Sequence, residues 1–315
     1  MTDARPILID CDPGQDDALA LLLAFASPEL EVLAVTTVAG NVPLALTAAN
    51  ARRIAELAGR PDVPVHAGCA APLIRPLVTA EHIHGQTGLE GADLPPPTIP
   101  LQSEHAVDAI VRILRERPPG SVTLCPIGPL TNLAMAFRKA PDIVPRAAEI
   151  VLMGGALGEG NVTPSAEFNI HADPHAARIV FESGVRIVMH GLDVTRQALA
   201  TPDRLAAIRA LGTRVGHAAA GLLEFYNVYH RTRRGRVGAP LHDPCAIAWL
   251  LRPELFEGRD CAVDVETAGE FTLGRTVVDW SGRTGRTPNA RVVTRIDADG
   301  FFALLTERLA RLTPP

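Results

Sequence analysis

Short apolar runs alternate with segments of helical periodicity along most of this chain, and this alternation limits the fold more than any other feature. An apolar run bounded by turn residues predicts a buried strand, whereas apolar residues three and four apart predict a helix. Strands are expected at 7–11, 31–38, 63–66, 121–126, 149–153 and 185–190. Helices are expected at 16–26, 43–58, 104–116, 129–139, 173–183, 202–210, 213–231 and 243–251. The alternation indicates βαβ units, and therefore an α/β fold with an open, mainly parallel, Rossmann-like sheet flanked by helices.

The last part of the chain and two internal stretches depart from this pattern. An antiparallel extension of the sheet is expected after residue 258, with shorter strands at 261–267, 275–280 and 290–296 and a closing helix at 301–312. Stretches 67–100 and 154–172 are rich in Pro, Gly and polar residues, so long loops of the kind that often carry function are expected there. No interdomain linker stands out, and residues 1–315 are expected to form one domain.

Four carboxylates stand together where the first expected strand turns into a helix. The segment reads Asp10-Cys11-Asp12-Pro13-Gly14-Gln15-Asp16-Asp17. In a parallel sheet this turn lies at the carboxyl edge, where ligands bind in the crevice beyond the strand ends. Like charges in such a turn repel one another unless a cation compensates, and carboxylate oxygens suit Ca²⁺ or Mg²⁺. The segment predicts a divalent-metal site, although helix capping alone would account for any one of these residues.

Composition excludes several classes of function and location. A net charge of −5 argues against a nucleic-acid-binding surface, and the single lysine, Lys139, argues against a P-loop or a Schiff base. No apolar run approaches the roughly 20 residues of a membrane span. The N-terminus lacks the features of a signal peptide, and five scattered cysteines form no C-x-x-C pair. A cytoplasmic protein with reduced thiols is therefore expected.

Further polar motifs follow the other expected strands or open helices. Their order along the chain is Asn41, His84-Gly85-x-x-Gly88, Ile127-Gly128-Pro129-Leu130-Thr131-Asn132, Met153-Gly154-Gly155, Asn161, Glu167-Phe168-Asn169 and His242-Asp243-Pro244. Together with the acidic segment, these motifs resemble the nucleoside hydrolase family over roughly residues 7 to 250. Members of that family are Ca²⁺-dependent enzymes that cleave the N-glycosidic bond of ribonucleosides. The resemblance implies a small-molecule ribonucleoside substrate.

The resemblance assigns roles to the residues of these motifs. It implies that Ca²⁺ is bound by Asp12, Asp17, Asp243 and the carbonyl oxygen of Ile127, with Asp10 close by. It implies a ribose-binding set of Asp16, Asn41, Glu167 and Asn169, near Phe168, and a reacting face lined by Asn161 and Met153. Asp12 would then take a proton from the attacking water as general base. These residue types suit an oxocarbenium-like transition state, which needs a water on one face of the sugar and a departing base on the other.

Candidates for contact with the nucleobase come from separate parts of the chain. His84 and His242 are expected to donate a proton to the base or to contact it, because imidazole titrates near neutral pH. Tyr226, Tyr229 and Arg233 share one expected helix and are candidates for a cap on the base pocket, although such spacing is also typical of core residues. His82 is expected to face elsewhere.

Two alternative functions and the choice of base stay open from the sequence. The apolar-Asp-x-Asp opening also resembles a haloacid-dehalogenase-like Mg²⁺ phosphatase, and the same scaffold would serve a non-catalytic nucleoside- or ribose-binding protein. An EF-hand is excluded because Leu21 stands where its twelfth-position Glu would be, counting from Asp10. The two histidines resemble the branch that prefers inosine and uridine or pyrimidine ribonucleosides. The purine-specific branch is expected to stack the base on tryptophans, and Trp249 and Trp280 lie away from the motifs. The family also implies a homo-oligomer, a dimer or a homotetramer.

Overall fold

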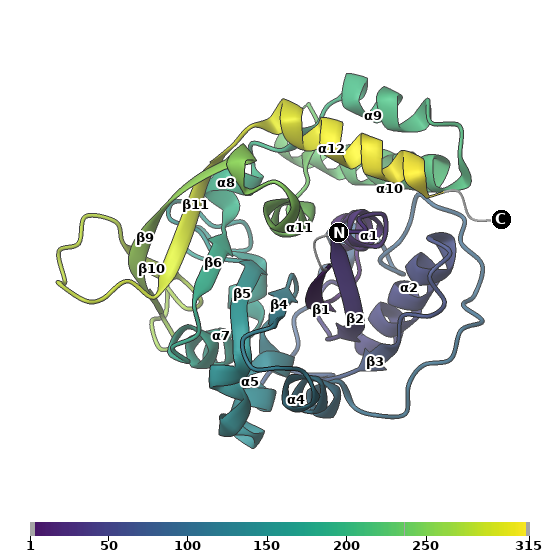
Figure 1. Ribbon diagram of the computed structural model, residues 1–315. Coiled ribbons are helices and arrows are strands. Elements are labelled where there is room, and N and C mark those ends of the chain that lie inside the picture. Colours follow the sequence, from purple (N-terminus) through teal and green to yellow (C-terminus); the bar gives the residue numbers. More distant parts are fainter. Residues whose placement is uncertain (1–3, 236, 313–315) are drawn as a thin grey trace.

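One nine-stranded sheet runs through the centre of the molecule (Figure 1). The computed structural model describes residues 4–235 and 237–312, apart from the side chains of residues 230, 233 and 234. The strands are β1 Arg5–Cys11, β2 Leu30–Thr37, β3 Val65–Ala67, β4 Val122–Pro126, β5 Ala147–Met153, β6 Ile187–His190, β9 Phe256–Val265, β10 Thr276–Asp279 and β11 Ala290–Ile296. A separate two-stranded ribbon joins β7 Leu199–Ala200 to β8 Ala239–Pro240.

The order of the strands confirms the expected α/β fold with a mainly parallel sheet. Across the sheet the order is β10-β9-β11-β6-β5-β4-β1-β2-β3, and the strands from β3 to β11 pair in parallel. The antiparallel extension is only partly as predicted, since β11 joins parallel to β6, and β9 and β10 then follow through antiparallel pairings. The chain leaves β1 on one side for β2 and returns on its other side as β4. Such a reversal opens a crevice at the carboxyl ends of the strands.

Helices cover both faces of the sheet and form an outer layer beyond one of them. One face carries α1 Gln15–Phe25, α2 Leu44–Leu57 and α11 Pro244–Leu251, and the other carries α4 Ala106–Glu116, α5 Thr131–Lys139 and α7 Pro174–Phe181. The outer layer holds α9 Pro202–Arg209, α10 Arg214–Arg234 and α12 Ala298–Arg311. Among the described residues no helix is both long and apolar enough to cross a membrane.

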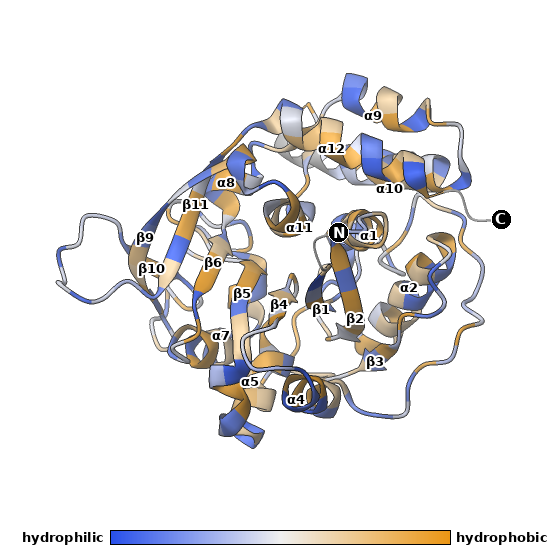
Figure 2. Cartoon of the chain, in the orientation of Figure 1, coloured by the Kyte–Doolittle hydropathy of each residue, from blue (hydrophilic) through white to orange (hydrophobic). Residues whose placement is uncertain are grey.

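Helix α1 is enclosed on all sides, and all eleven of its residues are buried. It packs on α2 and α11 and is covered from outside by α10 and α12. A helix that is apolar around its whole circumference is stable only in such a position. Figure 2 shows hydrophobic residues along β2 and β6, whereas α4 and α9 carry many hydrophilic ones. The first turn of α1 therefore lies deep in the molecule.

Several short elements escaped the sequence prediction. Helices α3 Glu81–His84 and α6 Phe168–Ala172 lie in the stretches expected to be irregular, and α8 Leu192–Thr195 follows β6. Two 3₁₀ helices, η1 Pro141–Arg146 and η2 Pro253–Leu255, complete the set. Elements of four or five residues are too short for a periodic signal. Local hydrogen bonds define them instead: the Glu167 carboxylate caps α6 by accepting from the backbone N–H groups of Asn169 and Ile170.

Candidate active site

A pocket opens at the carboxyl edge of the sheet, beside the reversal between β1 and β4. It is lined by Asp16, Asn41, Val78, Thr79, Ala80, His82, Ile83, His84, Ile127, Met153, Asn161, Val162, Glu167, Phe168, Asn169, Arg196, Tyr226, Tyr229, Pro240, His242 and Asp243. These residues come from strand ends, from the two long loops and from helix α10. The pocket therefore lies where open α/β sheets bind their ligands.

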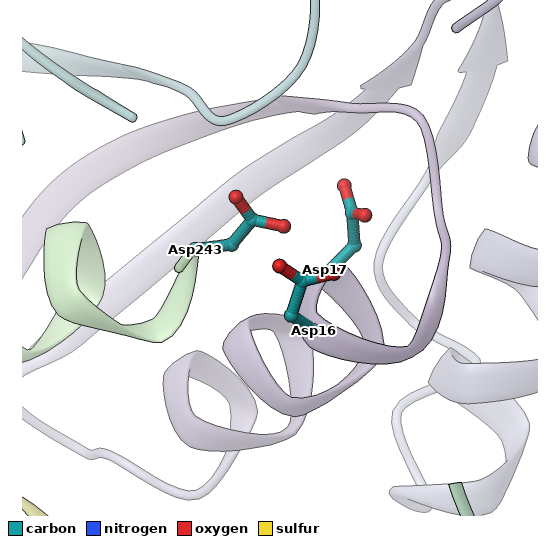
Figure 3. Close-up of side chains that lie close together, drawn as sticks. All are labelled: Asp16, Asp17 and Asp243. Carbon is teal, nitrogen blue, oxygen red and sulfur yellow. The ribbon is translucent and has the colours of Figure 1, made fainter. Parts of the chain in front are cut away.

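Five carboxylates form the bottom of the pocket, and we call them the acidic floor: Asp10, Asp12, Asp16, Asp17 and Asp243. Asp16 and Asp17 stand in the first turn of α1, and Asp243 directly precedes α11 (Figure 3). Oxygen atoms of Asp16, Asp17 and Asp243 all lie within 4.8 Å of one another. Two helix N-termini thus bring carboxylates from distant parts of the chain to one point.

Asp12 is held beneath the pocket surface by its neighbours on three sides. Its Oδ2 accepts a hydrogen bond of 2.7 Å from the backbone N–H of Asn41. A Cβ on Gly40 would lie 2.0 Å from Oδ2, and a Cβ on Gly128 would lie 2.4 Å from Oδ1. Only glycine leaves room for the carboxylate at both positions, which explains why Gly40 precedes Asn41 and Gly128 follows Ile127.

Hydrogen bonds also fix the other carboxylates of the turn. Asp17 accepts from the backbone N–H groups of Asp12 and Gly14 and from the side-chain amide of Asn41. Asp10 accepts through Oδ1 from Thr36 and Asn132, while its buried Oδ2 has no hydrogen-bond partner among the described residues.

Burial and mutual repulsion make ionisation of the acidic floor costly. Burial raises the pKa of Asp10 to about 7. Burial, reinforced by the charge of Asp17, raises the pKa of Asp16 to about 8 and that of Asp12 well above its usual range. The pKa values of Asp17 and Asp243 are raised as well, again mainly by burial. No basic side chain is among the main influences on these five pKa values. A buried set of oxygen donors without a protein cation fits a hard divalent ion such as Ca²⁺.

A second side of the pocket is formed by the end of β5 and the loop that follows it. The side-chain amide of Asn169 donates to the carbonyl oxygens of Ile127, at 2.8 Å, and Met153, at 3.2 Å. Glu167 accepts from three backbone N–H groups, and burial raises its pKa to about 7. Asn161 accepts through Oδ1 from the backbone N–H of Phe168. These bonds hold an amide, a carboxylate and a carbonyl oxygen at one surface.

Another side of the pocket is lined by aromatic and imidazole rings. We call this set the aromatic wall: His82, His84, Tyr226, Tyr229 and His242. His84 stacks on Tyr226 with 5.5 Å between ring centroids, and His82 meets Tyr229 edge to face at 6.2 Å. Nδ1 of His84 lies 2.7 Å from the side-chain oxygen of Gln15. The wall therefore combines flat apolar surfaces with groups that exchange protons near neutral pH.

Helix α8 supports both the aromatic wall and the loop of Asn161. The hydroxyl of Thr195 lies 2.7 Å from Nδ1 of His242. Asp193 accepts from the backbone N–H groups of Leu157 and Gly158, and Arg196 donates to the carbonyl oxygens of Glu159 and Gly160. One short helix thus fixes two parts of the pocket that are distant in sequence.

Most of the residues selected from the sequence come together in this pocket. Those that line it are Asp16, Asn41, His84, Ile127, Met153, Asn161, Glu167, Phe168, Asn169, Tyr226, Tyr229, His242 and Asp243. Asp10, Asp12 and Asp17 lie directly beneath it. The expectation that His82 faces elsewhere is wrong, because the turn of α3 brings its ring beside Tyr229. The side chain of Arg233 lies outside the described residues.

Sequence reasoning missed the supporting residues Gln15, Thr195 and Arg196. Gln15 lies within the acidic segment. As a polar residue directly before an apolar helix, it could have been selected as a site candidate. Thr195 and Arg196 follow the strand at 187–190, so the rule that polar residues follow strand ends applied to them also.

Comparison with known proteins agrees with the geometry of the pocket. Residues 7–303 match the family model described as inosine-uridine preferring nucleoside hydrolase. The pyrimidine-specific ribonucleoside hydrolase RihA of Shewanella sp. (strain ANA-3) is 51% identical over 312 residues, which are 99% of this chain and 98% of RihA. A purine-preferring ribonucleoside hydrolase from Gardnerella vaginalis has a TM-score of 0.92 at 34% identity, covering 98% of this chain and 99% of that one. A plant nucleoside hydrolase, PpNRh1, has a TM-score of 0.89 at 34% identity, with 97% and 99% covered.

These similarities extend over nearly the whole chain and confirm the resemblance that the motifs suggested. They also set aside a haloacid-dehalogenase-like phosphatase. This chain belongs to the family of inosine-uridine preferring nucleoside hydrolases and is therefore an N-glycosyl hydrolase.

Proposed function

We propose that this enzyme is a Ca²⁺-dependent ribonucleoside hydrolase that releases ribose and free base, with pyrimidine ribonucleosides as its preferred substrates. The observation that carries the proposal is the pairing, in one pocket, of the acidic floor with the aromatic wall. The carboxylate oxygens of the floor can bind a cation and sugar hydroxyls, and the rings of the wall can stack on a flat base.

Asp12, Asp17, Asp243 and the carbonyl oxygen of Ile127 would hold the Ca²⁺, with Asp10 close behind them. When bound, the ion would orient the attacking water and lower its pKa. The donor set supports this assignment because it consists of oxygen atoms only. Its raised pKa values also indicate that the floor needs a cation in order to be fully ionised.

The protein groups divide the chemistry between the two sides of the sugar. Water forms a bond to the anomeric carbon while the C–N bond breaks and its electrons move onto the base. Asp12 takes the proton of the water as general base. Asp16, Asn41, Glu167 and Asn169 bind the ribose hydroxyls, and Asn161 and Met153 face the reacting carbon. His84 or His242 supplies the proton that the departing base nitrogen acquires.

The preference for pyrimidines rests on relatives and on the composition of the wall. The RihA proteins that are about half identical to this chain are described as pyrimidine-specific. The described wall offers imidazole and phenol rings, whereas both tryptophans lie away from the pocket. The purine-preferring relative from Gardnerella is less similar, at 34% identity. Uridine and cytidine are therefore expected to be cleaved faster than inosine and adenosine.

Ribose release from uridine, cytidine, inosine and adenosine tests the proposal directly. Each substrate is offered to the protein with added Ca²⁺, after chelator treatment, and after Ca²⁺ has been restored. Turnover is expected only with the metal, and kcat/KM is expected to be highest for the two pyrimidines. Turnover that survives exhaustive chelation would refute the metal requirement, and a preference for inosine would refute the base assignment. Ca²⁺ and nucleoside binding without ribose release would identify a binding protein.

We extend the proposal to location and assembly. The five cysteines are all unpaired, which supports a reducing compartment, namely the cytoplasm. The family resemblance supports an assembly of two or four identical chains. Sedimentation of the purified protein measures the assembly.

A further inference from the structure

Gln15 is a fully buried polar side chain that the proposed mechanism does not use. It is the first residue of α1 and directly precedes Asp16 of the acidic floor. Its side-chain nitrogen donates to the carbonyl oxygens of His84, at 2.9 Å, and Glu90, at 3.3 Å. Its side-chain oxygen lies 2.7 Å from Nδ1 of His84. Gln15 thus contacts both the backbone and the ring of the same histidine.

These contacts determine which ring nitrogen of His84 carries a proton. The two carbonyl oxygens only accept hydrogen bonds, so they fix the side-chain nitrogen of Gln15 on their side. The remaining amide oxygen also only accepts, and Nδ1 of His84 must therefore be the donor. Both the neutral and the charged ring then hold a proton on Nδ1. The proton that His84 gains and loses is the one on Nε2.

The contact of Thr195 with the second histidine of the wall is of a different kind. Its hydroxyl either donates or accepts, so the contact at 2.7 Å from Nδ1 of His242 does not by itself select a tautomer.

The segment that carries His84 is also attached to the acidic turn at further points. Asn50 donates to the carbonyl oxygens of both Pro13 and Thr87. A Cβ on Gly14 would lie 2.4 Å from Nδ1 of His84, and a Cβ on Gly88 would lie 3.0 Å from the carbonyl oxygen of Pro13. The close approach explains the two glycines, and it places the ring of His84 against the acidic turn, where Gln15 contacts Nδ1.

We propose that Gln15 is a positioning residue that fixes the tautomer and orientation of His84, so that Nε2 delivers the proton to the departing base. The inference rests on the proposed function, in which a histidine of the wall protonates the base. In this step the proton leaves Nε2 and bonds to the base nitrogen that receives the C–N bonding electrons. Gln15 therefore links the acidic floor and the proton donor through adjacent residues of one turn.

A spectroscopic test reads the tautomer without any turnover. Long-range ¹H–¹⁵N spectra of the Ca²⁺-loaded protein distinguish the protonation of Nδ1 and Nε2 in neutral His84. The wild type is expected to show the Nδ1–H form, and Gln15→Met is expected to show a mixture of both forms. A wild type in the Nε2–H form, or a Met variant that retains only the Nδ1–H form, would overturn the proposal.

A kinetic test measures the consequence for proton delivery. The kcat for uridine is expected to fall about 10- to 100-fold in Gln15→Met, because a misplaced general acid loses most of its effect. Hydrolysis of 4-nitrophenyl riboside should change by less than about twofold, because a nitrophenolate leaves without a proton. Equal losses on both substrates would show that Gln15 acts only on folding or sugar binding. That result would refute the positioning role.

Two controls separate this role from other effects. Gln86→Met makes the same chemical change at an exposed position of the same segment and is expected to alter neither substrate. In a His84→Ala background, Gln15→Met should cost less than about twofold further on uridine, since its target is absent. A full additional loss there would contradict the proposal. If the wild type releases ribose from neither substrate, the proposed function fails, whereas the tautomer spectra still decide whether Gln15 positions His84.

Discussion

The acidic floor and the aromatic wall belong to one pocket, but the fold builds them in opposite ways. The floor comes from strand ends and helix N-termini, and all five of its carboxylates are buried. The wall comes from the short helix α3, the outer helix α10 and a loop, and His82 is exposed. In the proposed function, the chemistry common to all nucleosides would thus rest on buried strand ends and helix N-termini. Recognition of the base would rest on the loop and short-helix part of the fold, which tolerates change more readily.

The largest expected effect comes from the floor. Asp12→Asn removes the proposed general base, because an amide cannot take the proton of the attacking water. The kcat for uridine is expected to fall by roughly 10³-fold or more. The melting temperature of the metal-free protein should stay the same or rise, since one carboxyl group of a buried acidic cluster is removed. Steady-state kinetics in excess Ca²⁺ and thermal unfolding in the presence of chelator measure the two quantities, and a kcat within tenfold of wild type would disprove the assignment.

On the wall, loss of an imidazole should have a smaller effect. His84→Ala is expected to reduce kcat for uridine by about 100-fold, in the usual range for loss of a general acid. His217→Ala, an exposed histidine on α10 away from the pocket, provides the matched control and should leave kcat unchanged. A His84→Ala variant that changes KM alone would assign this ring to binding and not to proton transfer.

The floor should also make the stability of the metal-free protein depend on pH. The folded-state pKa values of Asp10, Asp16 and Glu167, at about 7, 8 and 7, lie above those of the unfolded chain. The folded protein therefore binds more protons than the unfolded chain between about pH 4 and pH 8, and its stability falls as the pH rises through this interval. A loss of roughly 5 kcal/mol from pH 6 to pH 8 is expected.

Ca²⁺ should reduce this loss, because a positive charge beside the acidic floor favours the ionised form of its carboxylates. Denaturant unfolding at the two pH values, with and without Ca²⁺, measures the effect. If the metal-free protein instead becomes more stable from pH 6 to pH 8, the folded state does not raise the pKa values of these carboxylates.

The smallest effect is expected at the rim of the wall. Tyr229→Ala removes the ring that meets His82 and should raise KM for uridine by about 2- to 10-fold, as for loss of one aromatic contact. The kcat for 4-nitrophenyl riboside should not change, because that substrate lacks the nucleobase. A large fall in kcat for uridine would instead place Tyr229 in the chemical step.

The same contrast explains how much of the molecule could be predicted from its sequence. Asp10, Asp12, Asp16 and Asp17 fall within eight residues, so one strand-to-helix turn was enough to place them at the carboxyl edge. The alternating pattern likewise predicted the parallel core, because each strand is long enough to show it. Asp243 and the wall could be assigned only through the family resemblance, since nothing local connects residue 243 with residue 16.

What escaped prediction depends on tertiary contacts. The role of Gln15 becomes visible only when His84, 69 positions later, lies against it. Thr195 is an ordinary residue of a four-residue helix until His242 lies beside it. The direction of β11 was also not predictable, because a short strand with polar residues can pair either way at the end of a sheet.

The complete enclosure of α1 should slow the exchange of its backbone amide hydrogens with solvent. Amide hydrogens that are buried on every side exchange with solvent only when the whole fold opens. The amides that follow Asp16 and Asp17 along α1 should therefore be among the slowest to exchange, whereas those of α3 should exchange through local opening. The carboxylates that begin α1 would then keep their arrangement for as long as the chain stays folded.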